Sequence, residues 1–250
     1  MNLVSRILAV LLLFLINSFS YAAELQRSEV VTMLSQATKA NPANLRRKDL
    51  TKLDLSGLDF RNADLWGADL RGANLSKSNL SGLVLDLTVM VAVNLEGADL
   101  SNVSIFGVSL MRSNLSNANL SGSRVIAILD NSNLSHANLS NVRWGADMKN
   151  QSMGLMRASL KKVNLSGANI SNADLGRAML RHANLTGANL QNTSLYSASL
   201  EGADFTDANL TNADLTHAKI TDANFTHAKV AGAIFKNVKG LDSARGLKLK

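Results

Sequence analysis

Histidine and aspartate are the residues of this chain that could serve a metal site or acid–base catalysis. The chain has no cysteine and four histidines, which are His136, His182, His217 and His227. Aspartates recur at every fifth position from Asp49 to Asp69. Whether either set of side chains can act together depends on how the chain turns between them.

A large apolar residue returns at every fifth position over most of the chain. The series runs from Leu50 to Val125, and it resumes at Leu160 and ends at Phe235. A small residue, most often alanine, precedes most of these positions by two, and Asn, Asp, Ser, Thr and Gly fill the places between. So many copies of one short unit predict a repeat architecture.

A period of five excludes both an α-helix and a straight strand. Strand side chains alternate between two faces, so an odd period would send every second leucine into water. The chain must turn once per repeat, with the small residue and the leucine inward and the polar residues at the corner. If four sides close one coil, Phe205 and Phe225, which are four pentapeptides apart, lie above one another. Stacked coils then form a β-ladder around one apolar core.

This geometry separates the residues that could do chemistry. His217 and His227 are two pentapeptides apart, which places them on opposite sides of a four-sided coil. The aspartates wind around the coil, where Asn and Asp serve as hydrogen-bonding corner residues. The sequence therefore predicts a protein that is not an enzyme and has no cofactor or metal site.

The segments ADLWGADLRGANLSKSNL and SGANISNADLGRAMLRHANLTGANL resemble the pentapeptide-repeat family. The resemblance extends from about Leu50 to Phe235. It implies the all-β fold of that family, a right-handed quadrilateral β-helix. It also implies an alternative function, because some members of the family mimic DNA and bind type II topoisomerases.

The segment before the repeats has a different pattern. Apolar residues from Leu25 to Ala37 recur at helical spacing, and Asn41 with Pro42 would end the helix. A solenoid needs such a cap because an exposed coil edge invites strand pairing. We expect a capping helix and linker at residues 23–48, the β-helix at 49–238, and a second cap or a basic tail at 239–250.

The period slips in the middle of the chain. Val125 is followed by Leu129, one position earlier than the period requires, and the original register returns only near Leu160. We expect a bulge, a loop or a bend between about residues 124 and 158. Such a bulge, loop or bend could divide the solenoid into two stacks.

The segment 1–22 is typical of a secretory signal peptide. A single Arg6 precedes an apolar run of about ten residues, too short to span a bilayer. Small residues at Ser20 and Ala22 predict cleavage after Ala22, and the mature chain has no further membrane span. We therefore expect a periplasmic or secreted protein. Loss of Arg6 lowers the formal net charge from +7 to +6. A positive net charge argues against DNA mimicry, because DNA is negatively charged.

Several outward positions are apolar although the repeat does not require it, and they predict an interface. Trp66, Phe106 and Ile126 follow core positions by one place at multiples of 20, which predicts one outward column. The candidate interface residues are Trp66, Val84, Val89, Val91, Phe106, Met111 and Ile126. Exposed apolar patches usually mark a contact, so a protein partner or a second copy of the chain is expected there. The other interpretation is that bulky inward residues nearby, such as Leu83 and Val93, widen the coils and cover some of these side chains.

A second surface is basic. Its candidate residues, several of them spaced by 20, are Arg157, Lys161, Lys162, Arg177, Arg181 and His182. An anionic envelope polymer would relieve the repulsion among them. Glu201 continues one of these columns, so a face that is simply solvated explains the pattern equally well. No aromatic residue on which bases could stack lies among the basic residues, so specific nucleic-acid binding is not favoured.

Overall fold

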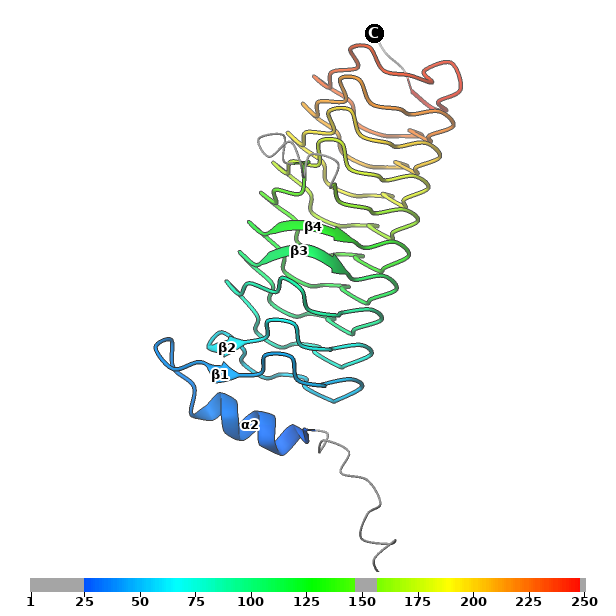
Figure 1. Ribbon diagram of the computed structural model, residues 1–250. Coiled ribbons are helices and arrows are strands. Elements are labelled where there is room, and N and C mark those ends of the chain that lie inside the picture. The colour runs from blue at the N-terminus through cyan, green and yellow to red at the C-terminus, as the bar shows by residue number, and fades with distance from the viewer. Residues whose placement is uncertain (1–24, 147–156, 248–250) are drawn as a thin grey trace, which may run out of the picture.

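The computed structural model describes residues 25–146 and 157–247 as a stack of coils with a helix at its N-terminal end (Figure 1). The predicted signal peptide, at positions 1–22, lies outside the described residues. The named elements are α2 (Arg27–Ser35), β1 (Ala43–Asn44), β2 (Ala63–Asp64), β3 (Ser104–Ser109) and β4 (Arg124–Ile128). Isolated parallel bridges between successive coils make up most of the other pairing. The prediction of a β-helix is confirmed.

Each regular coil contains four pentapeptides. β1 pairs in parallel with β2, and Asp49 pairs with Asp69, so a residue and its partner are separated by one full coil. We number the four sides of a coil by its fully buried inward residues: side 1 at Leu45, side 2 at Leu50, side 3 at Leu55 and side 4 at Phe60. Every other residue is assigned to the side of the inward residue that lies within two positions of it in the sequence.

The polar residues of the repeat make the corners. Two positions after each inward leucine the backbone takes a left-handed conformation, with φ of 68° at Gly67 and 54° at Arg47. Glycine adopts this conformation without the steric cost that other residues meet. The residue before the leucine fixes the turn: the Oδ1 atom of Asp69 accepts a hydrogen bond of 3.1 Å from the backbone N–H of Arg71.

Hydrogen bonds join the coils along every side. The backbone N–H of Leu185 donates to the carbonyl of Asp204 at 2.7 Å, and this pattern recurs throughout the stack. Side 3 adds a ladder of asparagines, in which Asn94 donates to Asn74 at 3.0 Å and Asn114 to Asn94 at 3.2 Å. Rigidity therefore comes from the ladder and the core, without disulfides.

The helix α2 covers the N-terminal coil edge (Figure 1). Its Val30 is fully buried, and Arg27 donates hydrogen bonds of 2.6 and 2.9 Å to the carbonyls of Asp54 and Ser56. One coil later the corresponding carbonyl of Asn74 accepts from the N–H of Leu55. Arg27 thus supplies donors where no preceding coil exists to supply them.

The stack continues through the register change. The difference in residue number between bridge partners falls from 20 to 19 at Asn114 and Asn133, rises to 31 at Asn133 and Asn164, and returns to 20 at Asn164 and Asn184. One coil is thus one residue shorter than the usual 20, and the next is eleven residues longer. The additional residues include 147–156, which lie outside the described residues. Because the ladder runs across this point, the solenoid is not divided into two stacks.

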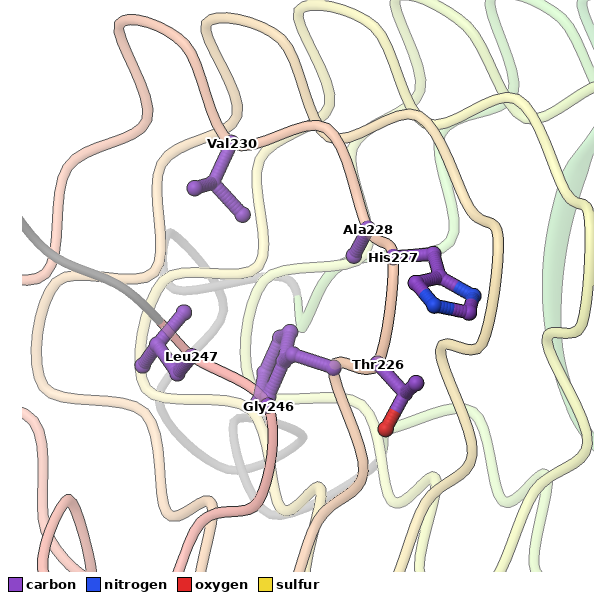
Figure 2. A pocket seen from close by; sticks show the side chains of 7 residues that line it. Thr226, His227, Ala228, Val230, Gly246 and Leu247 are labelled. Carbon is purple, nitrogen blue, oxygen red and sulfur yellow. The ribbon is translucent and has the colours of Figure 1, made fainter.

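The C-terminal end is less well covered than the N-terminal end. Inward residues of the last coil, such as Val230 and Phe235, are only partly buried. Figure 2 shows Val230 and Leu247 beside a hollow of about 380 Å³ at this end. Residues 239–247 continue the coil, since Arg245 pairs with Asn224, and they do not form a free tail.

Candidate interaction surfaces

Apolar side chains are exposed at the corner between sides 1 and 2. The exposed fractions are 60% for Val84, 56% for Leu87 and 39% for Val89. Most other coils carry a polar residue or glycine at the equivalent positions. All three residues belong to one coil, since each lies within a few positions of the fully buried Leu85.

Neighbouring coils enlarge this surface. Val91, Phe106 and Met111 are half-buried, and Val91 and Met111 occupy the same outward position of side 2 on successive coils. Ile128, on the following coil, is 45% exposed. We call this set the apolar patch; it consists of Val84, Leu87, Val89, Val91, Phe106, Met111 and Ile128. Its edge continues into a shallow hollow of about 380 Å³ lined by Ile128, Ser159 and Met179.

Trp66 does not join the apolar patch. In its outward column the next coil carries Asp86, whose Oδ1 atom accepts a hydrogen bond of 2.9 Å from the backbone N–H of Phe106. The guanidinium carbons of Arg46 and Arg47 lie 4.6 and 4.9 Å from the centroid of the Trp66 ring. Trp66 and Phe106 belong to one outward column, but Asp86 lies between them and the column is not a continuous apolar surface.

Ile126 is also misplaced by the sequence prediction, since only 3% of it is exposed. The short step from Val125 to Leu129 removes one residue from the corner between sides 1 and 2. β4 runs through this corner, and Ile126 and Ala127 are both buried. Ile128 then becomes the outward residue before Leu129. The short step was visible in the sequence and could have identified Ile128.

The predicted basic residues lie on sides 1 and 2 but do not form one basic face. Arg157, Lys161, Lys162, Arg181 and His182 are exposed, whereas Arg177 is half-buried. The Nζ atom of Lys161 lies 4.0 Å from the Oδ2 atom of Asp130, and Glu201 follows Arg181 in the same column. The guanidinium carbon of Arg177 lies 5.9 Å from the centroid of the Tyr196 ring.

Acidic side chains of the first coils are paired rather than free for catalysis. A hydrogen bond from the Arg71 side chain lowers the pKa of Asp69 below its usual range, and Arg61 does the same for the pKa of Asp59. These carboxyls therefore stay ionised near neutral pH. Across the described ranges, no group of three His, Asp or Glu side chains is arranged to hold a metal ion.

The repeats match a known family over most of their length. The pentapeptide repeat family model matches in eight copies, over residues 36–67, 68–105, 158–196 and 198–237. The chain belongs to the pentapeptide repeat family. Membership implies a right-handed β-helix, and pentapeptide repeat proteins are generally noncatalytic. Residues 106–157, where the register changes, lie outside the matched segments.

Solved pentapeptide repeat structures resemble this chain over much of its length. HetL from Nostoc sp. strain PCC 7120, involved in heterocyst differentiation regulation, is 29% identical, with 88% of this chain and 96% of HetL covered and a TM-score of 0.43. QnrB1, a plasmid-mediated fluoroquinolone resistance protein, is 16% identical, with 76% and 90% covered and a TM-score of 0.41. Rfr23 from Cyanothece 51142 is 27% identical, with 47% and 90% covered and a TM-score of 0.36. No curated protein matches the chain significantly.

Proposed function

We propose that this protein is a noncatalytic scaffold, exported to the periplasm or the cell exterior, that binds a protein partner through the apolar patch. The exposure of Val84 and Leu87, at 60% and 56%, carries the proposal. Neither position contributes to the core, and the repeat fills both with polar residues or glycine in most other coils. Water-exposed apolar side chains clustered in this way usually mark a contact.

The physical setting suits protein binding. Fully burying a valine or leucine side chain is worth about 1.5–3 kcal/mol. The patch lies on a hydrogen-bonded ladder that includes β3 and β4, so little conformational entropy is lost when a partner docks. A few such side chains can therefore supply a specific contact of moderate affinity.

The partner can be tested with paired variants. Val84→Ser combined with Leu87→Ser should leave the thermal midpoint within a few degrees of the parent, because neither side chain is core. Ile234→Ser, which removes another half-exposed apolar side chain far from the patch, is the matched control. Partners crosslinked to the tagged protein in intact cells and identified by mass spectrometry should be lost with the double variant and kept with the control. Loss of self-association alone would identify a second copy as the partner, and retention of every partner would contradict the proposal.

Export rests on the segment 1–22 and is tested separately. Among residues that the structure describes, no helix has the length and apolar character needed to cross a membrane. Mass spectrometry should find a mature N-terminus at Ala23, and cell fractionation should place the protein outside the cytoplasm. A cytoplasmic protein with an intact Met1 would contradict export, and binding to topoisomerase would then be tested. The positive net charge disfavours that alternative: it is +7 for the full chain and +6 once cleavage removes Arg6.

A further inference from the structure

A third hollow, distinct from the apolar patch, lies on side 1 in the C-terminal half of the stack. Its volume is about 370 Å³, within the range of small-ligand sites, and it opens widely to solvent. It is lined by Gly145, Ala146, Asp174, Gly176, Arg177, Ser194, Tyr196 and Asp214. None of these residues belongs to the apolar core of the stack.

Gly176 lines this hollow, and the backbone does not require glycine there. Its φ is not positive, and the left-handed corner position of this pentapeptide belongs to Arg177, with φ of 62°. Other coils place large residues at the position of Gly176 on side 1, including Trp66 and Phe106. A Cβ atom at Gly176 would lie 3.1 Å from the Oδ1 atom of Asp174 and 3.9 Å from the Oγ atom of Ser194, so glycine at this position keeps the Asp174 carboxylate and the Ser194 hydroxyl uncrowded in the hollow.

Tyr196 forms a wall of the hollow. Its side chain is among the exposed large hydrophobics, at 37% exposure. His217 contacts the ring edge-on, with centroids 5.6 Å apart and an interplanar angle of 82°, and the Arg177 guanidinium lies 5.9 Å from its centroid. These contacts orient the ring and leave part of its surface available for a ligand.

Hydrogen-bond donors and acceptors line the same hollow as the Tyr196 ring. Asp174, Ser194 and Asp214 pair in sequence along three successive coils, about 4.8 Å apart per coil. The Oδ1 atoms of Asp174 and Asp214 accept the backbone N–H bonds of their own corners, at 2.9 and 2.8 Å. Within the described chain their Oδ2 atoms make no hydrogen bond, so each offers an acceptor, while Arg177 and Ser194 offer donors.

This combination selects the chemical class of the ligand. A simple anion would be repelled by the two carboxylates, and a simple cation by the guanidinium. Hydroxyl groups both donate and accept, and the C–H face of a sugar ring packs on an aromatic ring. We infer that the hollow beside Tyr196 binds a neutral saccharide unit, in addition to the protein contact made by the apolar patch.

Calorimetric titration of the mature protein with maltotriose, cellotriose and N-acetylglucosamine trimer tests this inference. At least one of these probes should bind with a Kd of roughly 0.1–10 mM, as expected for one shallow site. The Kd should change little between low and high salt, because the ligand is uncharged. Tyr196→Ala should raise the Kd at least about tenfold, and so should Gly176→Leu, which adds a side chain to the lining and crowds the Asp174 carboxylate. Tyr196→Phe should retain most of the binding because the ring remains.

Matched controls separate this site from the rest of the surface. Trp66→Ala removes another solvent-accessible aromatic ring of side 1, and Val84→Ser with Leu87→Ser removes the centre of the apolar patch; neither should change saccharide binding. Absence of binding by every probe at a concentration of roughly 10 mM, the weak end of the expected range, would overturn the inference. So would binding that survives both Tyr196→Ala and Gly176→Leu, or preferential binding of spermidine or inorganic phosphate, which would show that the site selects charge.

Discussion

The division of each pentapeptide between core and solvent is very sharp at the level of single residues. Leu185 is fully buried, while Asn184 and Gly187 beside it are exposed. Small inward residues are equally constrained, and where a hydroxyl replaces alanine it needs a partner. Thr88, for example, donates to the carbonyl of Leu85 at 2.7 Å, which satisfies a group that would otherwise be costly to bury.

Substitutions at Leu185 should therefore be severe. Leu185→Ala should lower the free energy of unfolding by about 2–5 kcal/mol, because it leaves a cavity in the core column. Leu185→Asp should prevent folding, since its charge would be buried without a partner. Asn189→Ser, at a half-buried outward position where Ser194 and Ser199 stand in the following pentapeptides, should cost less than about 1 kcal/mol. Equal midpoints in urea for Leu185→Ala and Asn189→Ser would contradict the inward position of Leu185.

The pairing of Asp69 with Arg71 predicts a dependence of stability on pH. The folded pKa of Asp69 is lowered, chiefly by the hydrogen bond from Arg71. Its stabilising contribution is therefore complete above the unfolded pKa of about 4 and is lost as the pH falls through the lower folded pKa. Arg71→Ala should reduce the loss of stability between about pH 5 and pH 2, measured by urea unfolding. Arg181 makes no ion pair with a carboxylate in the part of the chain that the structure describes, so Arg181→Ala should leave the pH profile unchanged.

At the scale of elements, α2 and the corner at β4 show what local sequence can and cannot predict. The spacing of Leu25, Val30 and Leu34 predicts a helix near the one observed at Arg27–Ser35. It could not predict that Arg27 reaches the first coil, because that contact depends on where the helix packs. In the same way, the short step before Leu129 shows that a residue is missing, but the burial of Ile126 depends on the path of β4.

Removal of the Arg27 side chain should loosen the N-terminal edge of the stack. Its two hydrogen bonds to carbonyl oxygens are made by a charged donor at a partly exposed site, so Arg27→Ala should cost about 1–2 kcal/mol. Amide hydrogen exchange should become faster in α2 and in the first coil and stay unchanged beyond residue 160. Lys39→Ala, which removes an exposed cation after the helix, is the control. Faster exchange throughout the stack would show that the end does not open separately.

At the scale of the whole molecule, a period of five predicts nearly all of the core. It correctly assigns the inward leucines from Leu50 to Leu120 and from Leu160 to Leu215. Phe205 and Phe225 stack with centroids 4.8 Å apart, as their spacing of one coil predicts. The outer surface was less predictable. Side chains from neighbouring coils decide it, as Arg46 and Arg47 do when they pack against Trp66. The period determines which side a residue occupies. It does not determine the way in which extended side chains of neighbouring coils pack over one another.

Because each coil contacts only its neighbours, the length of the stack should be adjustable in steps of one coil. Deletion of residues 181–200 joins Leu180 to Glu201 and preserves the side of every later residue, since Met179 and Ser199 already pair across one coil. This variant should fold, with the circular dichroism of the parent and a proportionally smaller denaturant dependence of unfolding. Deletion of residues 181–198 removes almost as much core but places Ser199 where Arg181 stands, so later leucines leave the inward positions. That variant should be unfolded or aggregated, and equal stability of the two would mean that the coils tolerate a shifted register and that the ladder between successive coils does not determine the fold.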